Sequence, residues 1–500
     1  MRALKQFPAF SVLLFGAAAL MLVPALHAAH LGDWRIARTF LYHAIFFAIV
    51  AVILGLALMN RMPEKAERYQ LVTLLLAYLL LPVALALPLQ QVQPLSFSAA
   101  YFEMLSSLTT TGATVFDRHW LVPQPVHLWR ALVGWAGGLM ILVAAFAVLA
   151  PLNLGGFEIV RASRSEGDVR QSLSVPSARE RIVRCLRVIA PVYLLFTGLL
   201  ATLLMIAGDR PFVALCHAMS TLATSGISPI GGPAVSRGGF GSEMLIAIFL
   251  FAAVSHRVLT VRFSRGRSPR LRDPEVQLML ISVLAVTVVL FLRAFVGAIE
   301  ADRQANLLAA AQAVWGSLFT VLAHLTTAGF ESRYWLTTQI WSRLEAPGII
   351  LLGVAVMGGG IATTAGGVKL LRLYALYRHG LREMDRLVYP STPGRRGHAG
   401  GGLIAEAGTR IAFVFLMLFL MALALVTMAL AASGLSFERA LTLAVAALTT
   451  TGPLIATLGD GTTYRELNDA ARWILCAAMV VGRMEALVII ALFNPSYWQR

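Results

Sequence analysis

The chain has 500 residues, of which 58% are hydrophobic and only 13% are charged. Soluble domains carry about 25% charged residues, so this composition excludes the set of soluble domains that length alone would suggest. The formal net charge is +16. The basic residues gather between apolar runs, which favours a membrane protein over one that binds nucleic acid.

Ten apolar runs reach or approach the roughly 20 residues that a helix needs to cross a bilayer. We therefore expect an all-α, polytopic membrane protein with about ten transmembrane helices in a lipid bilayer. The runs cover residues 11–26, 40–59, 71–89, 132–152, 188–207, 244–259, 276–299, 348–356 and beyond, 411–432 and 473–493.

The first run resembles a signal peptide, because a basic N-terminus precedes a short apolar stretch that ends in small residues. The second run begins at Phe40 after only a short connector, however. A hairpin of two retained helices fits this spacing better than a cleaved leader does.

Four segments hold clusters of basic residues, and the loops that alternate with them have little excess of such residues. Loops rich in lysine and arginine stay in the cytoplasm, so we expect these segments on the cytoplasmic side. They are residues 60–68, 161–184, 262–272 and 369–386.

A short motif recurs four times, at intervals of roughly 100 to 120 residues. It reads SSLTTTGATVFD at 106–117, STLATSGISPIG at 220–231, AHLTTAGFESR at 323–333 and AALTTTGPLIA at 446–456. A half-apolar segment of about 12 to 16 residues precedes each copy. At about 1.5 Å per residue, such a helix is too short for a hydrocarbon core of about 30 Å. The repeating unit is therefore expected to be span, half-helix, turn and span.

A non-helical turn at membrane depth survives only where protein buries it or where it lines water. Four equivalent turns can meet on one axis, where their carbonyls replace the hydration shell of a cation and the negative ends of the half-helices favour it. A lone copy would more simply be a helix C-cap or a loop. The residues expected to bind potassium ions are Thr110, Thr111, Gly112, Thr224, Ser225, Gly226, Thr327, Ala328, Gly329, Thr450, Thr451 and Gly452.

Together with the four turns, three further stretches carry a resemblance to a known family. They are residues 127–142, residues 358–372 with 379–390, and residues 482–498. With these residues the chain resembles the Trk/Ktr/HKT superfamily of potassium transporters, most of all its bacterial TrkH branch. The resemblance implies potassium uptake across the bacterial inner membrane, four pseudo-symmetric repeats around one pore, a homodimer, and regulation by a cytosolic, TrkA-like nucleotide-binding subunit. It leaves channel-like flow and symport open.

The chain departs from the family pattern in two places. The fourth turn has Thr449 to Thr451 where relatives often carry asparagines, and residues 137–141 read GGLMI where relatives tend to read GGMGI. In the superfamily, a serine at the first glycine position accompanies sodium preference. All four glycines are present here, which favours potassium over a sodium or mixed path.

The expected division follows the repeats. Residues 1–69 form the N-terminal hairpin, and the four pore repeats cover 70–160, 161–265, 266–400 and 401–500, with a glycine-rich gate in the third.

Six glycines fall between Gly353 and Gly367, inside the second span of the third repeat. Each costs a helix about 1 kcal/mol relative to alanine, so a break is expected just below the turns, where TrkH relatives have a blocking loop. Close helix packing is an alternative. A nucleotide-binding loop is disfavoured because the spacing is wrong and Leu370 follows Lys369. The expected gate consists of Gly358, Gly359, Gly360, Thr363, Thr364, Gly366 and Gly367, together with Arg483.

Arg483 interrupts the last apolar run, and a charge at membrane depth usually faces a cavity or a partner. We expect it beneath the turns, opposing cation occupancy or bonding gate carbonyls, with a salt bridge to another helix as the alternative. Arg130 and Arg293 are expected to extend toward the membrane surface. His217 and His324 are expected to pack in the core with their polar atoms satisfied.

No catalytic constellation is present in the sequence, so the chain is not expected to be an enzyme. The main alternative is sodium or mixed sodium/potassium transport. A different class of function would be a non-conducting membrane sensor or scaffold, which four intact turn motifs disfavour.

Overall fold

A computed structural model describes most of the chain, and the described part is helical, without strands. This confirms the expected all-α class. The described residues are 8–59, 66–151, 178–254, 274–300, 307–342, 347–388, 406–459 and 461–485.

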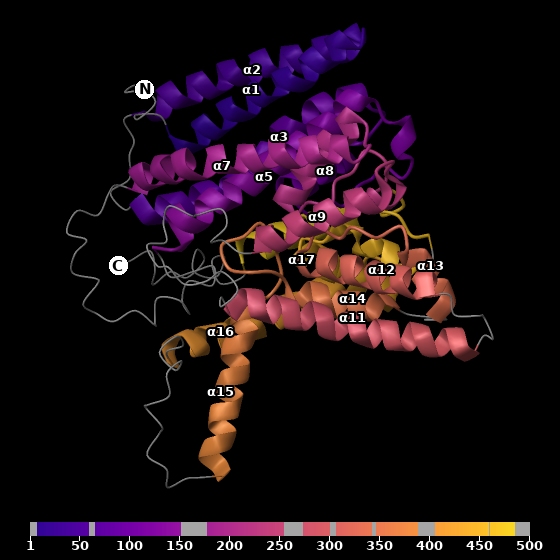
Figure 1. Ribbon diagram of the computed structural model, residues 1–500. Coiled ribbons are helices and arrows are strands. Elements are labelled where there is room, and N and C mark those ends of the chain that lie inside the picture. The colour runs from indigo at the N-terminus through magenta and orange to yellow at the C-terminus, as the bar shows by residue number, and fades with distance from the viewer. Residues whose placement is uncertain are drawn as a thin grey trace.

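The chain begins with a helical hairpin, α1 (Ala9–His30) and α2 (Trp34–Leu58), which lies along one side of the molecule (Figure 1). Asp33 caps α2 by accepting a hydrogen bond from the Ile36 amide over 3.2 Å. The α1 helix packs against both α3 and α5. The retained hairpin stays a prediction.

Four repeats follow, each with a long helix, a shorter helix that ends in a turn, and a third helix. The long helices are α3 (Ala66–Val92), α7 (Ala178–Ile206), α11 (Pro274–Glu300) and α16 (Glu406–Ala432). The shorter helices are α4 (Phe97–Leu108), α8 (Pro211–Ala223), α12 (Leu307–Leu325) and α17 (Phe437–Leu448). The third helices are α5 (Gln124–Ala144), which η3 (Ala145–Leu149) continues as a π-helix, α9 (Gly239–Val254), α14 (Pro347–Met357) and α18 (Asp469–Met484).

Smaller elements complete the repeats. They are η2 (His119–Leu121), η5 (Pro233–Val235), α13 (Trp335–Ser342), α15 (Leu370–Val388) and η8 (Gly452–Leu458). Most of the basic segment 369–386 lies in α15, which extends away from the body of the molecule (Figure 1). The basic residues at 60–65, 161–177 and 262–272 lie outside the described residues.

The repeats close into a ring. The third helix of each repeat packs against the short helix of the next, so that α5 meets α8, α9 meets α12, and α14 meets α17. The ring closes because α18 of the last repeat packs against α4 of the first. Each short helix is therefore held by its own repeat and by the preceding one.

Helix lengths agree with the sequence in most places and correct it in one. Within the described residues, eight helices are long and apolar enough to span a membrane; seven match expected spans, and the eighth is α12. We expected α12 to be a half-helix of 16 residues, but Leu307 to Ala309 extend it to 19, since leucine and alanine favour helix. The α14 helix has only 11 residues, about 16 Å, and cannot cross the bilayer.

The expected repeat boundaries remain predictions. Those at 160/161, 265/266 and 400/401 lie outside the described residues. The boundary at 69/70 falls inside the first turn of α3, which begins at Ala66.

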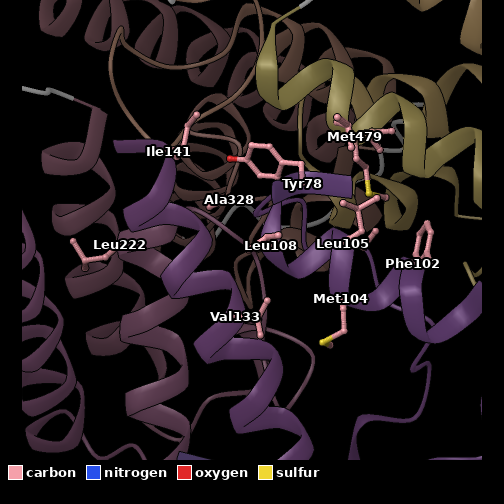
Figure 2. Close-up of a cluster of buried hydrophobic side chains, with 14 of the residues drawn as sticks. Tyr78, Phe102, Met104, Leu105, Leu108, Val133, Ile141, Leu222, Ala328 and Met479 are labelled. Atoms are coloured by element: carbon pink, nitrogen blue, oxygen red, sulfur yellow. The ribbon is translucent and has the colours of Figure 1, made fainter. Parts of the chain in front are cut away.

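The ends of the short helices lie in the buried core. Figure 2 shows side chains from α3, α4, α5 and α18 gathered around the end of α4, among them Tyr78, Leu108, Ile141 and Met479. Glycines make this approach close enough. A Cβ atom on Gly137 would lie 2.0 Å from the Leu108 carbonyl oxygen, and one on Gly482 would lie 2.3 Å from that of Leu448. The first and fourth repeats thus share one packing device.

Gly482→Ala should therefore destabilise the fold, by about 1–3 kcal/mol, because the added methyl group overlaps backbone that cannot move aside. Gly353→Ala is the matched control, since no atom lies within 4 Å of a Cβ at this helical glycine and alanine favours helix by about 1 kcal/mol. Thermal unfolding of the purified variants in detergent measures both. Equal midpoints for the two variants would contradict the packing role of Gly482.

Candidate functional site

All four turns share one backbone conformation. Thr110, Thr224, Thr327 and Thr450 have φ angles of 56°, 48°, 58° and 55°. In each turn, the amide of this threonine bonds the carbonyl three residues back and the next amide bonds the carbonyl five residues back. This is a Schellman helix end, with threonine where glycine is usual. The left-handed conformation costs a non-glycine residue roughly 1–2 kcal/mol, so the surrounding packing imposes it.

The four glycines two residues later form contacts that run around the ring. Gly112, Gly226 and Gly329 have positive φ angles, of 74°, 66° and 66°. A Cβ atom on any one of the four would meet the turn of the next repeat, and on Gly452 that of the first. The atoms nearest to this added Cβ are Ser225 O, at 1.9 Å for Gly112, Ala328 O, at 2.4 Å for Gly226, the Pro453 ring, at 3.0 Å for Gly329, and Ala113 N, at 2.2 Å for Gly452.

The twelve residues expected to form the site are thus brought together, and all except the partly exposed Gly226 are buried. The fourth turn differs in detail. Its glycine opens η8, and the Gly452 amide donates to the Thr111 carbonyl over 2.6 Å. The Tyr464 hydroxyl donates to the Gly452 carbonyl over 2.8 Å. The ring is therefore pseudo-symmetric.

The expected break in the third repeat is present as a loop after α14. Its neck is closed by hydrogen bonds from the Val368 amide to the Val356 carbonyl, 2.9 Å, and from the Lys369 amide to the Met357 carbonyl, 3.1 Å. Gly358 and Gly367 have φ angles of 70° and 79° at the two ends of the loop. Residues 358–367, which we call the glycine loop, project from this neck as one unit.

The glycine loop lies directly against three of the four turns. The Thr224 hydroxyl donates to the Thr364 hydroxyl over 3.0 Å, and the Gly366 amide donates to the Thr327 hydroxyl over 2.9 Å. A Cβ on Gly366 would lie 2.1 Å from the Thr449 carbonyl oxygen. Close packing and a broken helix, which the sequence left as alternatives, therefore occur together. Gly353 takes no part in this packing, since nothing lies within 4 Å of its Cβ position.

Buried charges hold the glycine loop from two other helices. Arg483 of α18 donates from Nη1 to the Thr364 carbonyl over 2.5 Å, and Glu275 of α11 accepts from the Ile361 amide over 2.9 Å. Arg483 thus bonds a loop carbonyl, one of its two expected roles. Among the described residues Arg483 forms no salt bridge. Glu485, the nearest acidic residue in the sequence, pairs with Arg372 over 2.6 Å instead.

The expectation for Arg130 was wrong. Its side chain is buried and pairs through Nε with Glu103 of α4, and its guanidinium lies 5.3 Å from the centre of the Phe116 ring. The partner is 27 residues away on another helix, so the sequence around Arg130 does not reveal it. Arg293, in contrast, lies exposed on α11.

The two histidines are buried, and each has one hydrogen-bond partner. His217 Nε2 lies 2.8 Å from the Ser228 hydroxyl, and His324 Nδ1 lies 2.8 Å from the Thr320 carbonyl. The second ring nitrogen of each has no partner among the described residues. They are therefore half satisfied, less than the sequence analysis expected.

One acidic residue follows a turn closely. Glu331 lies two residues beyond Gly329, and burial raises the pKa of its carboxyl above the ordinary value. It therefore keeps its proton to a higher pH than an exposed glutamate does.

Four helix–turn–helix repeats, closed into a ring with their turns converging, define a multi-pass membrane protein built around one central pore. The TrkH family of cation transport proteins matches residues 39–500, and the chain belongs to this family. It is 31% identical to the Trk system potassium uptake protein TrkH of Salmonella typhimurium over 418 residues, 81% of this chain and 80% of that protein. It is 29% identical to the TrkH protein of Halomonas elongata over 476 residues, 91% of this chain and 92% of that one.

A solved structure shares the fold. The crystal structure of the potassium transporter TrkH from Vibrio parahaemolyticus matches with a TM-score of 0.81 and 24% identity, covering 100% of both chains. The relatives are named as transporters, in agreement with the expectation that the protein is not an enzyme.

Proposed function

We propose that the protein conducts potassium ions into the bacterial cell across the inner membrane, through a selectivity filter made by the four turns. The observation that carries this proposal is the ring of contacts by which each turn glycine meets the next turn. The names of the relatives as potassium uptake proteins support the choice of ion.

The chemistry of the filter follows from the turns. Each short helix directs its negative end, about half an elementary charge, toward the ring, which favours a cation. Carbonyls of the residues beside the glycines would replace water around a dehydrated ion. The Thr111 carbonyl accepts a hydrogen bond from the Gly452 amide. This hydrogen bond has to break before that oxygen can face an ion. Residues Thr110, Ser225, Ala328 and Thr451 belong to the same proposed filter.

The glycine loop is the proposed gate. It lies against three turns, and Arg483 ties it to α18. The positive charge of Arg483 would also oppose a cation beneath the turns. The loop residues Gly358, Gly359, Gly360, Thr363, Thr364, Gly366 and Gly367 would move together, because the neck hydrogen bonds hold both ends of the loop.

The proposed assembly is a homodimer with a cytosolic, TrkA-like nucleotide-binding subunit. The relatives belong to a Trk system by name, which implies further components. The α15 helix follows the glycine loop directly and extends from the body. Its exposed Tyr377 and Leu387 would give such a subunit a contact connected to the gate.

Rubidium uptake into liposomes tests the filter, with sodium as competitor. Wild-type protein should take up rubidium in preference to sodium, and Gly112→Ser should raise sodium permeation relative to rubidium. A side chain at 112 overlaps the Ser225 carbonyl oxygen and displaces the second turn.

Gly32→Ser is the matched control for Gly112→Ser. Gly32 also has a positive φ, 79°, but nothing lies within 4 Å of its Cβ position, so the backbone strain is similar and the filter is untouched. Unchanged selectivity in folded Gly112→Ser would remove the first turn from the filter. A wild type that prefers sodium would replace the proposal with sodium transport, and one without flux would favour a sensor or scaffold.

Deleting residues 362–366 should raise basal rubidium flux. The deletion removes the contacts of Thr364 and Gly366 with the second and third turns, while the neck bonds at Val368 and Lys369 lie outside it. Flux per folded molecule measures the effect, and Gly353→Ala, on α14 outside the loop, serves as control. Flux at the wild-type level would mean that the glycines serve packing only.

Arg483→Ala should also raise basal flux, most of all at low external rubidium, because it removes both a bond to the gate and a positive charge. Arg483→Lys keeps the charge and should give an intermediate flux. Arg483 is buried and bonds the Thr364 carbonyl, so its loss could instead lower the stability of the fold. Loss of folded Arg483→Ala protein with unchanged flux per molecule would therefore make Arg483 a structural residue.

A further inference from the structure

Each short helix carries a fully buried side chain nine residues before its turn glycine. When the four repeats are aligned on their glycines, this position holds Glu103, His217, Thr320 and Leu443, and each is 0% exposed. Three of the four are polar, although they face the interior of a membrane protein. A buried polar group is costly unless it is bonded, so their partners indicate what they do.

In the first repeat, Glu103 holds the non-helical segment that follows the glycine, which we call the post-turn segment. Its Oε2 accepts from the Val115 amide over 2.8 Å, three residues beyond Gly112. Its Oε1 pairs with Arg130, whose guanidinium lies over the ring of Phe116. One carboxylate thus connects the rigid α4 helix to the backbone just past the turn.

The third repeat makes the same connection with different chemistry. The Thr320 hydroxyl accepts from the Ser332 amide over 3.3 Å, and Ser332 is also three residues beyond its turn glycine. The Ser332 hydroxyl and the Arg333 amide both donate to Glu243 of α9, over 2.7 Å each. This post-turn segment is therefore held from its own repeat and from the preceding one.

The second repeat uses a side-chain version of this bond, and the fourth replaces it. His217 Nε2 lies 2.8 Å from the Ser228 hydroxyl, which also accepts from the Gly232 amide over 2.9 Å. Leu443 has no polar atom, and in its repeat the Tyr464 hydroxyl donates to the Gly452 carbonyl instead. A carboxylate, an imidazole and a hydroxyl thus occupy equivalent positions in three repeats, and each bonds the post-turn segment of its own repeat.

We propose that Glu103, His217 and Thr320 are positioning residues that determine ion specificity. Each fixes the post-turn segment to the short helix, and so fixes where the filter carbonyls lie and how far they yield to an ion. The inference rests on the proposed function. Selectivity among cations depends on the size of the carbonyl site or on its number of ligands. If a post-turn segment is free to move, neither the size of the site nor its number of ligands stays fixed. The fold itself remains, because the helix contacts around the ring hold it.

The third repeat gives the cleaner test. Thr320→Val keeps the shape of the side chain and removes the acceptor for the Ser332 amide, whereas Thr320→Ser keeps the hydroxyl. In liposomes, Thr320→Val should raise the sodium-to-rubidium permeability ratio roughly two- to ten-fold, the factor that one net hydrogen bond corresponds to. Thr320→Ser should stay near the wild-type ratio. An equal rise in both would overturn the role of the hydroxyl.

The first repeat gives an independent test without leaving a buried charge unpaired. Glu103→Gln combined with Arg130→Met removes the ion pair but keeps an acceptor oxygen for the Val115 amide. Glu103→Leu combined with Arg130→Met removes both and copies the side chain of the fourth repeat. The permeability ratio should rise in the second double variant relative to the first, while a residue that only stabilises the fold would change the amount of folded protein alone.

The outcomes separate this inference from the function on which it rests. Selective rubidium flux in the wild type, with unchanged ratios in folded Thr320→Val and in the folded Glu103→Leu double variant, would overturn the positioning role and leave the filter proposal intact. Absence of rubidium flux in the wild type would overturn both. If one variant does not fold, the other repeat decides.

Discussion

The structure depends on how backbone amides and carbonyls are satisfied where a helix stops inside a membrane. An unpaired backbone group in hydrocarbon costs several kcal/mol, and the four short helices of this chain end in turns inside the buried core. The Schellman bonds at Thr110 and its three equivalents satisfy the first amides beyond each helix. In the first and third repeats, the post-turn segments are bonded by the buried side chains of Glu103 and Thr320. The ring of repeats supplies the walls that make these bonds possible.

The same constraint explains the glycine loop. A loop of ten residues below the turns has its own amides and carbonyls to satisfy, and it uses side chains from three sources. Thr327 of a turn, Glu275 of α11 and Arg483 of α18 each bond its backbone. Thr327 and Glu275 belong to the third repeat, as the loop does, whereas Arg483 belongs to the fourth, so a shift of the fourth repeat relative to the third changes the support of the loop. The charged side chains of Glu275 and Arg483, which lie in apolar helices, therefore serve as hydrogen-bond partners for the backbone of the glycine loop.

The sequence predicted the repeat because its signals are local. Threonine–glycine motifs behind short apolar segments mark each turn, and the glycine run before Lys369 marks the break after α14. It mispredicted Arg130 because the partner, Glu103, belongs to another helix and nothing beside Arg130 indicates the pairing. The length of α12 was underestimated because no residue marks where a helix of leucines and alanines begins.

The positioning residues were missed for a different reason. In each separate repeat, a polar residue within an apolar helix looks like an ordinary buried side chain. The alignment of the four motifs contains a usable signal, because the position nine residues before the glycine is polar in three repeats. The role of this position became visible only from the hydrogen-bond distances between these side chains and the post-turn segments, since carboxylate, imidazole and hydroxyl share no sequence pattern.

The glycine run occurs in one repeat of four, although the ring is built from four similar units. A pore assembled from four identical chains would carry four copies of any such loop, and its closure would be a collective event with partly closed intermediates. Here one loop touches three turns, and one covalent chain holds both the four turns and the loop. Under the proposed function, this one loop then moves as a single gate, without the partly closed intermediates that four separate gates would give.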